Sequence, residues 1–171
     1  MPLIKAVNNK KPDIADNVYC ADNSTIIGDV IIDNDTSIWF NAVIRGDVNS
    51  IVIGKRVNIQ DGAVIHATYK KSKTIIGDNV SIGHNAVIHG CTINNNVLIG
   101  MGAIIMDRSV IESNSVIAAG SVVTEGSEIK SGFLYTGTPA IQIRKLTNLE
   151  IEKLIENTAS NYLLYSSWFK V

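Results

Sequence analysis

The chain has 171 residues, a formal net charge of −1 and two cysteines. The balanced charge gives no reason to expect nucleic acid or an anionic membrane as a partner, while two cysteines exclude a disulfide scaffold and fit a reducing compartment. No run approaches the roughly 18 apolar residues of a membrane span, and residues 1–14 lack the apolar block of a secretion signal, so we expect a single cytoplasmic domain over residues 1–171.

Residue usage changes along the chain and indicates a β-rich body followed by a helical tail. The 27 isoleucines far outnumber the 8 leucines. Branched isoleucine suits a pleated strand, whereas leucine favours helices. Five of the leucines lie after residue 145. We therefore expect strands over about 18–140 and a helix over about 147–166.

Aliphatic side chains recur every six residues from about residue 18 to residue 135. These anchors are Ile26, Ile32, Ile38 and Ile44, then Ile53, Ile59 and Ile65, then Ile76, Ile82 and Ile88, and, after one five-residue step, Ile93, Ile99, Ile105, Ile111, Ile117, Val123 and Ile129. Cys20 and Tyr135 continue the register at its two ends, and small or short β-branched residues, Thr92 among them, follow the anchors by four positions. A period of six fits neither a helix nor plain alternation, but it fits short strands joined by tight turns.

The repeat predicts an all-β fold, a parallel β-helix, followed by a C-terminal α-helix. An ordinary β-sandwich with isoleucine-rich strands is the alternative, and the number of anchors in register argues against it. The pattern resembles the left-handed parallel β-helix of hexapeptide-repeat proteins. That resemblance implies the left hand and three faces with one hexad each, and it says little about function because the fold hosts several activities.

Two insertions interrupt the repeat, and an amphipathic segment follows it. One insertion comes after Ile44 and the other after Ile65, and we expect both to emerge as loops on a functional face. In the tail, Thr147-Asn-Leu-Glu150 has the form of a capping box and predicts a helix of about residues 149–165. Such a helix must cover its own coils or a neighbouring subunit.

The three histidines of the chain, His66, His84 and His89, fall at two corners of the predicted prism. His66 and His89 each follow an anchor by one residue, so they occupy the same corner on consecutive coils. Stacked strands lie ~4.8 Å apart, a spacing at which two imidazoles can chelate one metal ion. His84 follows its anchor by two residues and lies at another corner, from which it can join the pair only across a subunit boundary.

Three subunits around a threefold axis would complete three equivalent sites, and a closed ring of identical subunits is a common solution. Three imidazoles with an open fourth position form a catalytic zinc site, and Fe2+ or Co2+ are alternatives to Zn2+. Such a metal creates hydroxide at neutral pH. Arg45 shares the column of His66 and Asp61 shares that of His84, so Arg45 would face Asp61 across the interface. The alternatives are solvated turn histidines and a solvated surface ion pair.

Five stretches together resemble the gamma-class carbonic anhydrase family. They are Ile44-Arg45-Gly46-Asp47, Asn58-Ile59-Gln60-Asp61, Ile65-His66, the segment from Ile82 to Cys91, and Gly137-Thr138-Pro139-Ala140. The resemblance implies a homotrimer that holds zinc or iron between subunits and hydrates carbon dioxide reversibly to bicarbonate by a metal-bound hydroxide. His66 and His89 would come from one chain and His84 from the next.

The same resemblance implies roles for further polar residues. Arg45, Asp47 and Asp61 resemble interfacial salt-bridge residues, while Asn58 and Gln60 resemble residues that line the metal-water pocket. Tyr162 resembles a tyrosine near the site, as Asn157 resembles an asparagine there, in a looser match.

The sequence departs from the archetypal enzyme in two places. Val48 stands where that enzyme carries a glutamate, and the insertion after His66 is short and basic instead of acidic. Proton release would then depend on buffer or on another side chain such as Tyr69.

Two other functions stay open at this point. A coenzyme A-dependent acyltransferase or thioester hydrolase would need only one histidine as general base, and a non-catalytic relative would keep the metal as an assembly subunit. We expect Cys91 to be a packed thiol, and Trp39, Phe40 and Trp168 to be packing residues.

Overall fold

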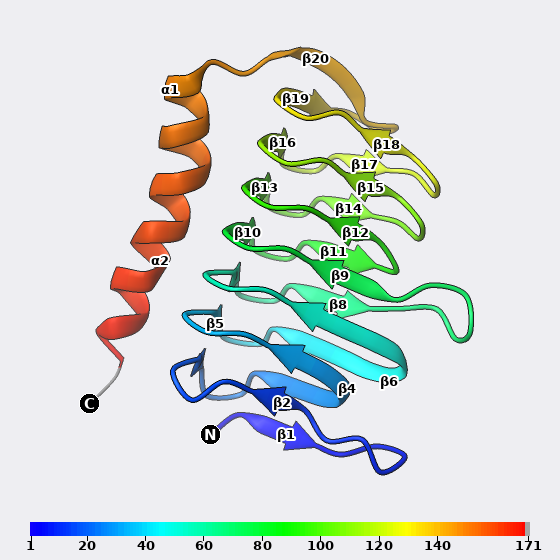
Figure 1. Ribbon diagram of the computed structural model, residues 1–171, viewed down its shortest axis with the longest axis vertical. Coiled ribbons are helices and arrows are strands. Elements are labelled where there is room, and N and C mark those ends of the chain that lie inside the picture. The colour runs from blue at the N-terminus through cyan, green and yellow to red at the C-terminus, as the bar shows by residue number, and fades with distance from the viewer. Residues whose placement is uncertain (170–171) are drawn as a thin grey trace.

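The computed structural model describes residues 1–169 and has the architecture that the repeat predicts (Figure 1). The chain winds into a stack of coils, and successive coils contribute parallel strands to three faces around one core. A C-terminal helix runs back along one side of the stack, so that its end lies beside the early coils. Within the described residues, no helix is both long enough and apolar enough to cross a membrane.

The strands pair in register, coil upon coil, with the anchors opposite one another. The first face contains β1 (Leu3–Lys5), the first parts of β4 (Thr25–Ile32) and β6 (Val43–Ile53), β8 (Val64–His66), β11 (Val87–His89), β14 (Ile104–Ile105) and β17 (Val122–Val123). The second face contains β2 (Asp13–Ile14), the last parts of β4 and β6, β9 (Thr74–Ile76), β12 (Thr92–Ile93), β15 (Val110–Ile111) and β18 (Glu128–Ile129).

The third face is a separate sheet that ends in an antiparallel strand. It contains β3 (Tyr19–Cys20), β5 (Ser37–Ile38), β7 (Asn58–Ile59), β10 (Val80–Ile82), β13 (Val97–Ile99), β16 (Ser115–Ile117), β19 (Phe133–Thr136) and β20 (Ile141–Lys145). The reversal between β19 and β20 stops the stack. It also directs the chain towards the helix.

The anchors form one continuous apolar core. Every isoleucine anchor from Ile26 to Ile129 is at most 2% exposed, and the small residues between them are buried as well. One position differs from the expected pattern. The small buried residue of this coil is Cys91 and not Thr92, because the step from Ile88 to Ile93 is five residues long instead of six. The predicted packed thiol at Cys91 is therefore confirmed.

Asparagine residues with left-handed backbone conformations allow the tight turns between faces. Asn23, Asn41, Asn96 and Asn114 all have φ near +60°, in the left-handed region that asparagine tolerates better than most residues. Their side chains bond from coil to coil, Asn23 to Asn41 at 3.1 Å and Asn96 to Asn114 at 3.3 Å. The turns are thereby stacked in columns, which keeps the corners of the prism aligned.

The two insertions have different structures. The one after Ile65 is a loop over residues 67–73, as predicted, closed by a bridge between Thr68 and Ser72. The prediction of a loop after Ile44 was wrong, because those residues continue as β6, an 11-residue strand that bends around the corner between two faces. The pairing also begins earlier than residue 18, since β1 and β2 both pair with β4.

The helix covers the third face of its own coils. It consists of α1 (Asn148–Glu150), a π-helical segment η1 (Ile151–Glu156) and α2 (Asn157–Ser167). The predicted capping box is present, with the Glu150 amide donating to Thr147 Oγ1 over 3.2 Å and the Thr147 amide donating to the Glu150 carboxylate over 2.9 Å. Ile155 and Ala159 are buried where the helix meets β5, β10 and β13.

Candidate metal centre

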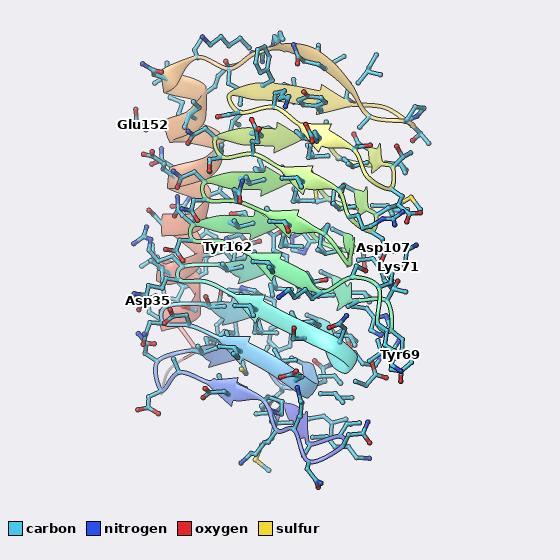
Figure 2. All side chains as sticks on the ribbon, turned by 45° about the vertical axis from the view of Figure 1, so that its right-hand side comes forward. Asp35, Tyr69, Lys71, Asp107, Glu152 and Tyr162 are labelled. Atoms are coloured by element: carbon cyan, nitrogen blue, oxygen red, sulfur yellow. The ribbon has the colours of Figure 1, made fainter. Side chains whose placement is uncertain are left out.

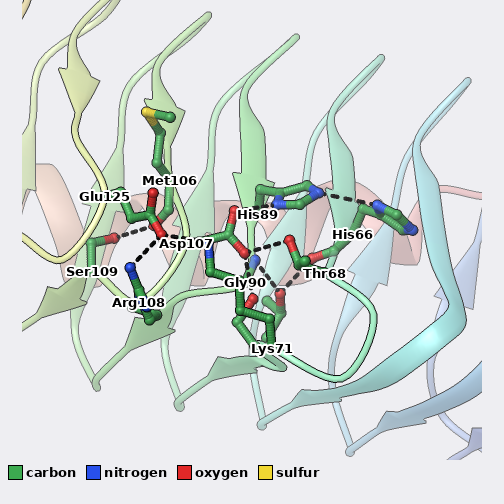
Figure 3. A network of polar contacts seen from close by, with 12 residues as sticks. His66, Thr68, Lys71, His89, Gly90, Met106, Asp107, Arg108, Ser109 and Glu125 are labelled. Carbon is green, nitrogen blue, oxygen red and sulfur yellow. Dashed lines mark hydrogen bonds and ion pairs between the residues drawn. The ribbon is translucent and has the colours of Figure 1, made fainter.

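His66 and His89 lie directly opposite each other at the end of β8 and β11. Their backbones are paired in register, and His66 Nδ1 lies 3.1 Å from His89 Nε2 (Figure 3). The predicted stacking of these two histidines on consecutive coils is therefore confirmed. Two nitrogens that each lie about 2.1 Å from a tetrahedral metal are about 3.4 Å apart, so the spacing suits a shared ion.

Carboxylates hold the other nitrogen of each ring. His66 Nε2 lies 3.1 Å from Asp47 Oδ1, and His89 Nδ1 lies 2.8 Å from Asp107 Oδ2. A carboxylate accepts a hydrogen bond, so each outer nitrogen carries the proton and each inner nitrogen presents a lone pair. Two facing lone pairs repel unless a cation or a shared proton lies between them. The donor set therefore fits a metal ion, with the two acids as outer partners.

The charges around His66 favour this arrangement. Burial lowers the pKa of His66, partly offset by its hydrogen bond to Asp47, so the ring is kept neutral and able to bind a metal. Burial alone would raise the pKa of Asp47, but hydrogen bonds from Arg45 and His66 outweigh it and lower that pKa. Arg45 Nη1 lies 2.6 Å from Asp47 Oδ2, so within one chain Arg45 is paired with Asp47.

Asp107 was not among the residues predicted from the sequence. It follows β14, on the coil after the one that carries His89, and its Oδ1 accepts from Thr68 Oγ1 over 2.7 Å and also from Ser72 Oγ. Burial alone would raise its pKa, but the hydrogen bonds from Ser72, Thr68 and His89 lower it to about 2. The Asp107 carboxylate beside His89 is therefore ionised at neutral pH.

His84 lies at the other corner, in the turn after β10. Its Nδ1 lies 3.0 Å from Asp61 Oδ2, so the predicted column of Asp61 and His84 is observed. Both side chains are about 40% exposed, His84 at 40% and Asp61 at 43%. Among residues 1–169, no three His, Cys, Asp or Glu side chains of one chain converge to hold a metal ion. Within one chain, His84 therefore does not join the pair formed by His66 and His89.

Asn58, Gln60 and Tyr162 lie on the helix side of the prism. Gln60 Nε2 donates to Asn58 Oδ1 over 2.9 Å, and Asn58 Nδ2 donates to Ser81 Oγ over 2.7 Å, in a buried chain of amides. Tyr162 packs edge-on against Trp39, with the ring centroids 5.3 Å apart. Figure 2 shows Tyr162 on the helix and Asp107 on the opposite side of the stack.

A cavity of about 300 Å³ lies beside Tyr162. Asp61 lines it, and so do aromatic side chains that include Phe40 and Trp168. Burial raises the pKa of Tyr162 to about 12, so its phenol stays protonated at neutral pH and can donate a hydrogen bond. The cavity therefore combines apolar walls with one carboxylate close to His84.

The chain is similar to known proteins over nearly its whole length. The family model described as bacterial transferase hexapeptide (six repeats) matches residues 73–105 and 90–130. A protein of Geobacillus kaustophilus named carbonic anhydrase is 44% identical over 168 residues, which cover 98% of this chain and 91% of that protein. The solved structure of a hexapeptide transferase family protein from Anaplasma phagocytophilum is 41% identical, with a TM-score of 0.93 and 98% of each chain covered.

A longer relative carries the name of the class. Gamma carbonic anhydrase 1, mitochondrial, of Arabidopsis thaliana is 43% identical over 161 residues, and this chain spans 58% of its length. The resemblance read from the histidine, arginine and aspartate motifs is thus matched by relatives that are more than 40% identical to this chain over the aligned residues. The chain belongs to the gamma carbonic anhydrase family of hexapeptide-repeat proteins.

Proposed function

We propose that this protein is a carbonic anhydrase that hydrates carbon dioxide reversibly to bicarbonate at three sites in a homotrimer. Each site takes His66 and His89 from one chain and His84 from the next. The ion is Zn2+, with Fe2+ or Co2+ as alternatives that imidazole ligands also bind.

The facing nitrogens of His66 and His89 carry this proposal. They are 3.1 Å apart, and both outer nitrogens are held by carboxylates. The site needs a third imidazole, and His84 lies partly exposed at another corner with its Nδ1 on Asp61. A second copy is therefore the source of the third ligand. Relatives named carbonic anhydrase support the choice of reaction.

The metal, when bound, supplies a Lewis acid that makes water a nucleophile near neutral pH. The residues of the chain do the rest. Asp47, Asp61 and Asp107 keep one proton on the outer nitrogen of each histidine, so the inner nitrogens stay free for the metal. The chain that supplies His84 also supplies Asn58 and Gln60, a pre-ordered amide pair that orients the substrate or water, and the protonated Tyr162, which offers a hydrogen bond. Arg45 with Asp61 of the next chain would hold the subunits together.

Metal analysis and a hydration assay on one preparation test the proposal. Protein purified without oxygen should contain one metal per chain, migrate as a trimer and speed carbon dioxide hydration in stopped flow. His84→Ala should lose both metal and activity. Lys73→Ala, an exposed loop change, is the control and should retain both. A metal-replete trimer with no hydration above the buffer rate would refute the enzymatic proposal.

A coenzyme A-dependent acyltransferase is the second candidate, because the similar solved structure bears a hexapeptide transferase name. Such an enzyme would use one histidine as base and no metal. Tight binding of coenzyme A by metal-free protein, measured by calorimetry, would favour it. Undetectable binding at millimolar coenzyme A would remove this candidate.

A further inference from the structure

We propose that Asp107 is a positioning residue that orients His89 for the metal, and that the loop over residues 67–73 holds Asp107 in place. The inference rests on the proposed metal site and adds to it a residue and a loop. Figure 3 shows the network, in which Asp107 lies between His89 and the loop.

The two oxygens of the Asp107 carboxylate have different partners. Oδ2 lies 2.8 Å from His89 Nδ1, while Oδ1 accepts from Thr68 Oγ1 over 2.7 Å and from Ser72 Oγ. Because the loop hydroxyls hold one oxygen, the carboxylate cannot rotate away from the imidazole. The remaining oxygen therefore fixes both the direction of the His89 ring and the position of its proton.

The backbone leaves room for this contact at Gly90, which is next to His89. Gly90 has φ +59°, and a Cβ built there would lie 2.3 Å from Asp107 Oδ1 and 2.2 Å from Ser72 Oγ. Strand register places residue 107 opposite residue 90, one position past the column of the histidines. A side chain at position 90 would push the carboxylate away from His89.

Two further contacts tie the loop to the stack. Asn49 Nδ2 donates to the Ser72 carbonyl over 2.9 Å and to that of Thr68 over 3.3 Å, so the base of the loop is held from β6. On the outside, Lys71 and Arg108 both pair with Glu125, at 2.7 and 2.6 Å. The loop is a clamp on Asp107, which gives this short basic insertion a function other than proton transfer.

Metal affinity and the visible spectrum of the Co2+ form test this assignment. We expect Asp107→Asn to weaken Zn2+ binding by about 10- to 100-fold, measured against a chelator, and to alter the Co2+ absorption bands. Glu125→Gln removes a carboxylate from the same network that touches no histidine. It should change affinity by less than about 3-fold and leave the bands unaltered, since exposed ion pairs contribute little.

A loop variant tests the clamp without changing Asp107. Thr68→Val removes one donor to Oδ1 at nearly constant volume, and we expect a loss of several-fold in Zn2+ affinity with shifted Co2+ bands. The proposal would be overturned if Asp107→Asn bound Zn2+ with wild-type affinity and showed wild-type Co2+ spectra. Should that variant not fold, the same result in Thr68→Val would overturn it. The metal site itself would stand in that case, whereas a wild-type protein that binds no Zn2+ or Co2+ would refute the proposed function as well.

Discussion

A neutral imidazole has one donor and one acceptor nitrogen, and the three aspartates beside the histidines decide which nitrogen is which. Asp47, Asp61 and Asp107 each contact one histidine at 2.8 to 3.1 Å. Without those carboxylates, each ring would exchange between two tautomers, and only one of them leaves the metal-facing nitrogen free. The carboxylates thus prepare the histidines for the proposed metal by fixing their tautomers.

Cys91 gives a test of burial at the residue scale. Burial raises the pKa of its thiol from the ordinary 9.0 to about 12. The folded state therefore keeps a proton that the unfolded chain releases above pH ~9. The contribution of this thiol to the free energy of unfolding is intact below that pH and is lost as the pH rises towards 12. We expect stability to fall by up to about 1.4 kcal/mol per pH unit per thiol in this range.

The measurement is the urea midpoint between pH 8.5 and 10.5 for the wild type and for Cys91→Ala. The variant should lose less stability as pH rises. The variant still contains Cys20, whose pKa burial raises to about 11. The stability of the variant should therefore still fall with pH, but less steeply than that of the wild type. Parallel curves for the two proteins would mean that the thiol is not the group responsible.

Register explains which site residues could be predicted from the sequence. The hexad places His66 under His89 and Asp61 under His84, and both contacts are observed. Asp107 escaped prediction because Met106, not Asp107, continues the histidine column. Gly90 was the one feature of the sequence that could have indicated this contact, because a side chain at that position would occupy the space of the Asp107 carboxylate.

At the scale of elements, the two insertions show what a repeat pattern leaves open. Both lengthen a coil, yet one becomes the loop over residues 67–73 and the other is absorbed into β6. The pattern counts residues between anchors and says nothing of their pairing. The loop over residues 67–73 is set by contacts with Asp107 and Asn49 from other coils. The insertion after Ile44 instead lies within β6, which pairs with β4 at both of its ends and with β9 at its C-terminal end.

Close stacking of coils predicts a sharp contrast between two glycines. A Cβ at Gly100 would lie 2.4 Å from the backbone nitrogen of Ala119, whereas one at Gly102 would meet nothing within 4 Å. Gly100→Ala must therefore move the backbone of the next coil and should cost about 3 kcal/mol. Gly102→Ala meets only the strain of its φ of +66° and should cost about 1 kcal/mol.

Chemical unfolding of the two variants measures these costs. Equal losses, or a larger loss for Gly102→Ala, would show that the coils can separate to admit a methyl group. Circular dichroism of both proteins should show that the β-helix is retained.

At the scale of the whole molecule, the proposed site makes assembly part of the chemistry, because His84 lies at a different corner from His66 and His89. A ligand that binds only the assembled state stabilises it by mass action. We therefore expect chelator treatment to lower the melting temperature and to make the trimer dissociate on dilution, as followed by sedimentation. His84→Ala should not respond to the chelator. A wild-type trimer equally stable with and without metal would place the ion away from the interface.

The central claim is that each metal is shared by two chains, and mixed trimers of two defective chains test it most directly. His66→Ala and His84→Ala chains, each unable to bind metal alone, are co-expressed with different tags and the mixed trimers are isolated. Shared sites predict one metal per mixed trimer, because one interface then joins an intact His66 and His89 pair to an intact His84. Mixed trimers without metal would contradict the account, because sites built within single chains could not be restored by mixing.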